Sequence, residues 1–217
     1  MDVGWLTKGG VVMLPLLGFS LVAVALILER VLFWVKITRR QDRLAREVLA
    51  IYSHNPRNAF LKLERNTDLP IARIFLAALE LDRPNPEEFR LALESSAQAE
   101  MPLLKRFNTV FETIISLSPL LGLLGTVLGL IRSFASLKLG EMGGSSTLGV
   151  SAGISEALVS TAAGLVVAIF TLLFANTFRG LYLRQSALIQ EYGGQLELLY
   201  RRYYELGGVS ASYASTG

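Results

Sequence analysis

The sequence contains no cysteine and only one histidine among its 217 residues. Without cysteine the chain can form no disulfide, thiolate zinc site or thiol nucleophile. The single histidine, His54, lies outside every long apolar run, so a serine protease centre among apolar helices is not expected. The apolar runs also lack paired aspartates. We therefore expect neither an enzyme nor a bound metal or other cofactor.

Charge is also scarce, since charged residues make up 18% of the chain and hydrophobic residues 52%. Together with a mean hydropathy of +0.45, this composition is typical of a polytopic membrane protein. The basic residues are concentrated in one part, with 14 of the 21 Lys and Arg residues between Arg30 and Arg106. Such a block beside apolar spans marks the cytoplasmic side. Because matching acids accompany it and no Gly-aromatic motif is present, nucleic-acid binding is not expected.

The first uncharged run covers Gly9 to Leu28 and is long enough to cross a bilayer. The alternative is a cleaved signal peptide, but the core is long for one, and Glu29-Arg30 follows it instead of a small-x-small cleavage site. Basic residues are numerous directly after the run, whereas Lys8 alone precedes it. The positive-inside rule therefore predicts a periplasmic N-terminus at residues 1–8 and transmembrane helix 1 at 9–35.

Residues 36–107 are predicted to form a cytoplasmic helical domain, because apolar residues recur there at spacings of three and four. Asn85-Pro86-Glu87-Glu88 combines an N-cap residue, a proline at the first helical position and acids in the first turn, so a helix should begin there. The pattern continues without a strong stop into the next apolar segment. We expect this last helix to enter the membrane, with a kink at Pro102.

Two more spans follow, transmembrane helix 2 at 108–135 and transmembrane helix 3 at 149–179, with a periplasmic loop at 136–148 between them. Span 2 carries Gly125 and Gly129 as a GxxxG pair within a face of small residues, which lets helix backbones approach closely in lipid. A cytoplasmic helical tail is predicted at 180–206, and residues 207–217 are too small and polar to pack, so they are predicted to be disordered.

Glu156 stands alone as a carboxylate at the start of the third apolar run. On a helix it shares a face with small residues that include Ser160 and Gly164, and Thr161 lies beside that face. A carboxylate in such surroundings meets the requirements of a proton-relay site. The alternative is that Glu156 lies at the outer interface, because residues 157–178 are uncharged and can span a bilayer without it.

Spans 2 and 3 together resemble the ExbB/TolQ/MotA family of ion-driven motor subunits. The residues that carry the resemblance are SPLLGLLGTVLG at 118–129 and GISEALVSTAAGLVVA at 153–168, which follow the paired patterns PxxGLxGTVxG and GIxEALxxTAxGLxxA. The layout of one outer-start span, a long cytoplasmic stretch, two spans and a basic tail resembles ExbB and TolQ, whereas MotA-type stators have an additional span.

The resemblance implies an all-α polytopic protein that assembles as a homopentamer around an ExbD- or TolR-like single-span partner in the pore. It assigns Glu156, Thr161 and Thr126 to the proton pathway. It implies helix-packing or pore-lining roles for Pro119, Gly122, Gly125, Gly129, Ser160 and Gly164. Membrane lipids surround such an assembly, and a TonB- or TolA-like protein is the further partner.

The function expected on these grounds is a proton-channel subunit of a motor in the bacterial inner membrane, driven by the proton motive force. One alternative is a structural membrane scaffold without ion conduction, in which the glycine-rich faces only pack helices. Another is a TolQ- or motility-type motor with a different output. The residues leave open which of these systems the chain serves, and whether H+ or Na+ is carried.

Overall fold

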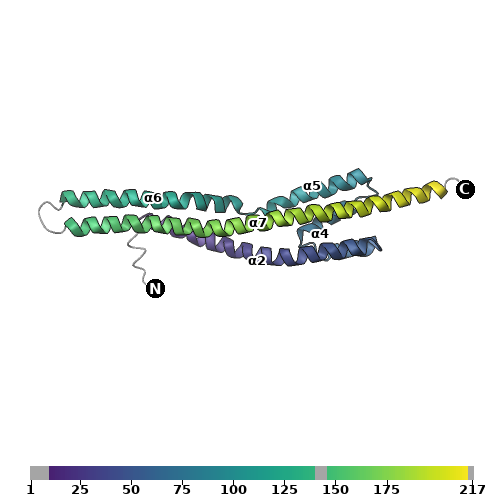
Figure 1. Cartoon of the computed structure of the whole chain (residues 1–217), viewed down its shortest axis with the longest axis horizontal. Helices are drawn as coiled ribbons and strands as arrows, with labels where there is room; N and C mark the ends of the chain where they lie inside the picture. Colours follow the sequence, from purple (N-terminus) through teal and green to yellow (C-terminus); the bar gives the residue numbers. More distant parts are fainter. Residues whose placement is uncertain (1–9, 140–145, 215–217) are drawn as a thin grey trace. The chain divides into compact units, whose positions relative to one another are not determined.

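The computed structural model describes residues 10–139 and 146–214, and these residues form α-helices joined by short turns, with no β-strand among them (Figure 1). The helices are α2 (Met13–Tyr52), α3 (Pro56–Glu64), α4 (Pro70–Leu79), α5 (Pro86–Leu104), α6 (Asn108–Leu139) and α7 (Ser146–Ala214). Three helical stretches, which contain α2, α6 and α7, are long and apolar enough to cross a membrane. The predicted all-α class is confirmed.

The chain divides into two compact units, and both long helices α2 and α7 contribute to each. Unit 1 consists of Met1–Arg30 and Phe107–Phe178, and unit 2 consists of Val31–Arg106 and Arg179–Gly217. Unit 1 therefore holds the long uncharged runs, and unit 2 holds most of the basic residues.

Unit 1 is built on an antiparallel hairpin of α6 and the first part of α7, which lie side by side in Figure 1. Small residues let the two backbones touch. A Cβ added at Gly129 would lie 2.7 Å from the carbonyl oxygen of Gly153, and one added at Gly164 would lie 2.4 Å from that of Ser118. The start of α2 packs on this hairpin through a small apolar cluster made of Val12, Met13, Leu16, Leu121, Leu128 and Ala163.

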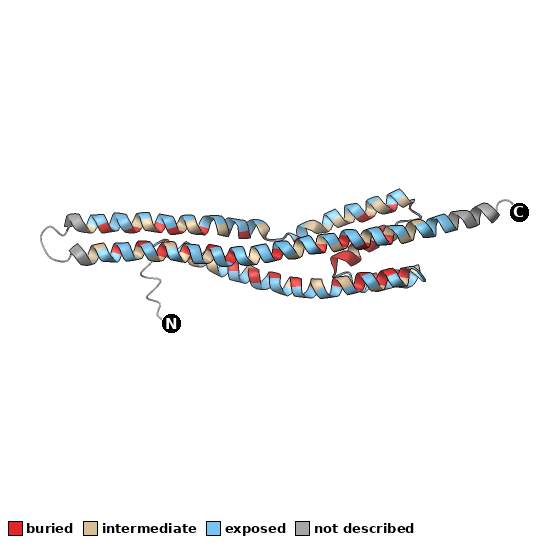
Figure 2. Cartoon of the chain, viewed as in Figure 1, coloured by how far each residue is buried: buried red, intermediate tan, exposed pale blue. Residues whose placement is uncertain are grey.

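In unit 2, helix α4 supplies much of the core because most of its residues are buried, as the red ribbon in Figure 2 shows. The second part of α7 is tied to neighbouring segments by tyrosines. Tyr192 donates a 2.5 Å hydrogen bond to Asp42 of α2, and Tyr200 donates one to the carbonyl oxygen of Pro84. The ring of Tyr200 also stacks on Phe89 of α5 at 4.0 Å between centroids.

The start of α5 is as predicted, with a capping box. The side chain of Asn85 accepts hydrogen bonds from the backbone of Glu87 and Glu88, and the Glu88 carboxylate accepts one from the backbone of Asn85. These contacts satisfy backbone donors that the first helical turn leaves unpaired.

The expected continuous helix from the soluble segment into span 2 is wrong. Helix α5 ends at Leu104 and α6 begins at Asn108, with Phe107 between them at a φ of 68°. That left-handed conformation ends a helix, since a right-handed helix requires negative φ. Pro102 therefore lies in the last turn of α5 and not at a kink within one long helix.

Several ends also differ from their predicted positions. Helices α6 and α7 extend into the predicted loop at 136–148, of which residues 140–145 lie outside the described residues. The predicted segment 1–8 also lies outside them. Helix α7 continues to Ala214, so residues 207–214 of the segment predicted to be disordered are helical, and residues 215–217 are outside the description.

Candidate functional site

Glu156 lies on α7 in unit 1 and faces α6, where it forms an ion pair. The guanidinium Nη1 of Arg132 donates to Oε1 of Glu156 at 2.5 Å. The Glu156 side chain is 18% exposed and that of Arg132 is 51% exposed, so the carboxylate is the more enclosed partner. A charge-assisted hydrogen bond of this kind is short and is stronger than a bond between neutral groups.

The backbone before α2 also reaches this carboxylate. Gly10 has a φ of +69°, and a Cβ built on it would lie 1.8 Å from Oε1 of Glu156. A side chain at position 10 and the observed position of Glu156 are therefore incompatible. Two features therefore favour glycine at position 10: it has no Cβ to occupy the space of the Glu156 carboxylate, and it adopts a left-handed φ without strain.

One to one and a half turns further along α7, two hydroxyl groups bond across the hairpin to a single carbonyl. Thr161 Oγ1 donates to the carbonyl oxygen of Gly122 at 3.1 Å, and Ser160 Oγ donates to the same oxygen at 3.4 Å and to that of Ala157 at 2.8 Å. Ser160 is fully buried. These bonds place hydroxyl groups inside the helix contact and satisfy them there.

The glycines of α6 make room for this arrangement. A Cβ at Gly125 would lie 2.3 Å from the Ser160 hydroxyl oxygen, and one at Gly122 would lie 3.1 Å from the Cα of Thr161. Pro119 is half-buried within α6, one residue after the fully buried Ser118. Gly122, Gly125 and Gly129 of α6 thus lie on the face that meets α7.

The predicted proton-pathway residues are not all brought together. Thr161 bonds to the carbonyl oxygen of Gly122 in α6. Glu156 precedes Thr161 on α7 by about five positions, or roughly 7.5 Å, and it contacts Arg132 of α6 instead. Thr126 Oγ1 instead donates to the carbonyl oxygen of Leu123 in its own helix, at 2.6 Å. Glu156 and Thr161 therefore contact the facing helix, whereas the hydroxyl group of Thr126 remains within α6.

Arg132 and Gly10 contact Glu156 but were not assigned to the site from the sequence. A signal for Arg132 was present, because it follows Gly129 by three positions and so lies on the same helical face as the GxxxG pair. No comparable signal existed for Gly10, whose role depends on how the start of α2 meets the hairpin. Its sequence context is an uninterrupted apolar run.

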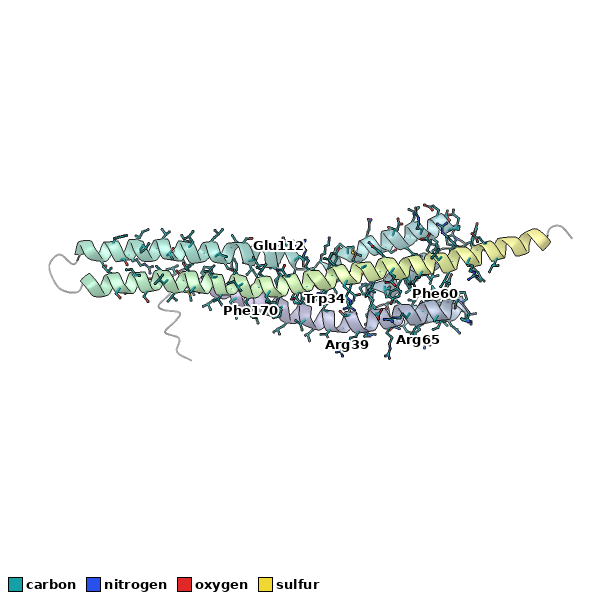
Figure 3. All side chains as sticks on the ribbon, viewed as in Figure 1. Trp34, Arg39, Phe60, Arg65, Glu112 and Phe170 are labelled. Atoms are coloured by element: carbon teal, nitrogen blue, oxygen red, sulfur yellow. The ribbon has the colours of Figure 1, made fainter. Side chains whose placement is uncertain are left out.

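A second cluster of charged groups lies in unit 2, around a cavity of about 320 Å³ lined by Thr38, Asp42, Arg46, Arg184, Leu188, Glu191 and Tyr192. Acids and bases balance there, and Asp42 already bonds Arg46 and Tyr192. This cluster links α2 to α7. Among the residues that the structure describes, no group of three or more His, Asp or Glu side chains is placed to hold a metal ion. Arg39 and Arg65, which are labelled in Figure 3, are exposed.

The fold and the site define a multi-pass helical membrane protein with polar groups enclosed in a tightly packed helix hairpin. A model of the MotA/TolQ/ExbB proton channel family matches residues 66–191. The chain is 65% identical over 197 residues to biopolymer transport protein ExbB-like 3 of Synechocystis sp., a match that covers 91% of this chain and 94% of that protein. The chain therefore belongs to the MotA/TolQ/ExbB proton channel family.

Other members of the family are also similar. Biopolymer transport protein ExbB-like 1 of Synechocystis sp. is 45% identical over 201 residues, which is 91% of this chain and 79% of that protein. The Tol-Pal system protein TolQ of Haemophilus influenzae is 35% identical over 107 residues, or 49% of this chain and 44% of that protein. The family is one of channel and transport proteins and not of enzymes.

Proposed function

We propose that this chain is a proton-channel subunit of an inner-membrane motor that uses the proton motive force to energise a TonB- or TolA-type process. The observation that carries the proposal is the enclosed carboxylate of Glu156 in the hairpin, within a chain of the MotA/TolQ/ExbB proton channel family. Intramembrane carboxylates are costly and are typical of proton pathways. The hydroxyl groups of Thr161 and Ser160 extend the polar face inward from Glu156.

The proposal includes a homo-oligomer, a pentamer by analogy with the family, around a single-span ExbD- or TolR-like partner. It also includes a periplasmic N-terminus and a cytoplasmic C-terminus. The exposed apolar surface of unit 1 supports both membrane contact and subunit contact, since α6 and α7 present large apolar side chains away from their mutual interface. These include Leu120, Leu123, Ile131, Leu158, Val166 and Ile169.

The test is proton flux through the complex purified from its native membrane by a tag on this chain and reconstituted in proteoliposomes. Glu156→Gln keeps the size of the side chain and removes its ability to ionise. We expect it to lower the flux about 100-fold or more, since a positioned proton-transfer group typically contributes about 10²–10⁴-fold. Glu112→Gln, at an exposed carboxylate near the start of α6 (Figure 3), is the matched control and should leave the flux unchanged.

Two alternatives give different results. A structural scaffold without conduction predicts that Glu156→Gln is tolerated and that Gly125→Leu, which collides with Ser160, is harmful. A proton-channel subunit of a different motor predicts the same flux loss with a different co-purified partner, which mass spectrometry identifies. The similarity to the Tol-Pal system protein TolQ supports this second alternative.

A further inference from the structure

We propose that Arg132 is a positioning residue for Glu156, and that the two side chains with Gly10 form a latch that must open before the carboxylate can take up a proton. This inference rests on the proposed function, because it concerns the regulation of the same site. It is separate from the packing role of the small residues, since Arg132 acts through its charge.

The contacts of Glu156 come from three segments of unit 1. Arg132 reaches it from α6, the Gly10 backbone covers it from the segment before α2, and α7 carries it. The residues of α7 within about one turn of Glu156 carry no charge. Among the described residues, the charged side chain that contacts the Glu156 carboxylate is therefore that of Arg132.

The position of the pair along the helices indicates what it separates. Arg132 directly follows the uncharged residues 113–131, and Glu156 directly precedes the uncharged residues 157–178. At about 1.5 Å per residue, these runs extend roughly 28 and 33 Å, close to the thickness of a bilayer core. In the proposed topology the pair therefore lies inside spans 2 and 3 near their periplasmic ends, where a proton from the outer side arrives first.

A guanidinium remains charged at all accessible pH values, and the one of Arg132 occupies Oε1 of Glu156 with a hydrogen bond of 2.5 Å. Water reaches the contact mainly from the side of Arg132, which is 51% exposed against 18% for Glu156, and this partial enclosure strengthens the contact. While the bond at Oε1 persists, Glu156 is an ion-pair partner and not a free proton acceptor. Opening the pair releases the carboxylate for protonation.

The decisive measurement is the rate at which an apolar carbodiimide modifies Glu156, quantified by mass spectrometry in the purified complex at pH 7. Carbodiimides react with the protonated carboxyl group, so an ion-paired carboxylate is protected. In Arg132→Gln we expect modification about tenfold faster than in the unchanged protein, equivalent to about 1.4 kcal/mol of lost protection. Arg132→Lys keeps the positive charge and should retain most of the protection.

Gly10→Ala disturbs the latch from the opposite side, because its Cβ would occupy the space of Oε1, and it should also speed modification of Glu156. Gly18→Ala is its control, since a Cβ there meets no atom within 4 Å. Arg179→Gln removes an exposed positive charge of α7 and controls for charge loss alone. Modification of Glu112 in the same samples reports any general change in accessibility.

Proton flux on the same proteoliposomes separates this inference from the proposed function. A latch predicts that Arg132→Gln conducts more protons at rest than the unchanged protein. The inference is overturned if neither Arg132→Gln nor Gly10→Ala speeds modification of Glu156, if Arg179→Gln speeds it equally, or if the resting flux of Arg132→Gln does not rise. Equal flux in the unchanged protein and in Glu156→Gln would instead overturn the proposed function, whatever the modification rates show.

Discussion

At the scale of single residues, the α6–α7 contact depends on positions where a side chain would meet backbone. Gly164 is the most crowded of them, since an added Cβ would lie 2.4 Å from the carbonyl oxygen of Ser118 and 3.1 Å from the Cα of Gly122. Backbone atoms cannot move aside as the end of a flexible side chain can. In lipid, where close packing replaces the hydrophobic drive, such contacts hold helices together.

We therefore expect Gly164→Ala to force the two helices apart and to destabilise the protein by about 1–3 kcal/mol, the usual cost of overpacking. Thermal unfolding of the detergent-purified protein measures this as a lower midpoint temperature. Gly180→Ala is the matched control on the same helix, because a Cβ there meets nothing within 4 Å and alanine favours helix. A midpoint for Gly164→Ala equal to that of Gly180→Ala would contradict the role assigned to the close contact.

The residue scale also shows the limits of periodicity. Ser160 and Thr161 were assigned from their motif, and both bond across the helix pair to one carbonyl oxygen. Thr126 belongs to the same resemblance, yet its hydroxyl group bonds within its own helix. Helical spacing gives the face on which a residue lies, whereas the partner of a hydroxyl group depends on its rotamer and on the neighbouring backbone.

At the scale of elements, helix ends are set by local chemistry where capping residues are present. The capping box at Asn85 satisfies donors at the start of α5 and was recognisable from four consecutive residues. The end of α5 lacks such a signal, and the left-handed conformation of Phe107 separates α5 from α6. For a bulky residue this conformation is uncommon, so surrounding contacts must maintain it.

Asn85→Ala removes the acceptor for two backbone N–H groups, and we expect it to destabilise unit 2 by about 0.5–2 kcal/mol. Because α5 packs on α4, whose residues form much of that core, loss of the cap should lower the cooperative unfolding midpoint. Hydrogen exchange should rise first in residues 86–90. Gln98→Ala, at an exposed position within α5, should leave both measurements nearly unchanged, and an equal effect at both sites would argue against the cap.

At the scale of the whole molecule, the chain combines two units with different sources of stability. Unit 1 relies on close backbone contacts between small residues, and unit 2 relies on a buried apolar core with polar ties at its periphery. One such tie joins Asp68 to two cations of α2. Lys36 lies 3.1 Å and Arg40 lies 2.7 Å from the Asp68 carboxylate.

Partial burial by itself raises the pKa of Asp68, but the hydrogen bonds and charges of Lys36 and Arg40 outweigh it and hold that pKa below its ordinary value of 3.8. A lowered pKa in the folded state stabilises the protein above the ordinary value, and this stabilisation is lost as the pH falls through the lowered value. Asp68→Asn should therefore lower the free energy of unfolding at pH 7 and leave it unchanged at strongly acidic pH.

Because Asp68 is 38% exposed, solvent screening limits the expected cost at pH 7 to about 1 kcal/mol or less. Unfolding midpoints of Asp68→Asn and the unchanged protein, measured from pH 7 down to 3, should begin to converge below about pH 4 and approach each other further as the pH falls toward the lowered pKa. Glu64→Gln, at an exposed carboxylate with no ion pair among the described contacts, controls for loss of a surface charge. A difference that stays constant with pH would exclude the ion cluster as its source.

The sequence by itself determined the features that depend on neighbouring residues. Runs of uncharged residues specify helices long enough to cross a bilayer, because water-free surroundings require every backbone group to bond within its own segment. The cap at Asn85 and the motif around Glu156 are equally local, so the all-α class, the start of α5 and the family could be predicted from the residues alone.

Tertiary structure decided which distant groups meet. Arg132 and Glu156 are 24 positions apart, and Gly10 joins them from the far end of the chain, so only the antiparallel return of α7 and the docking of α2 bring these three together. The break at Phe107 likewise has no local signal. Ion pairs and close backbone contacts between distant segments depend on how helices pack, and the helical period of a sequence does not specify that packing.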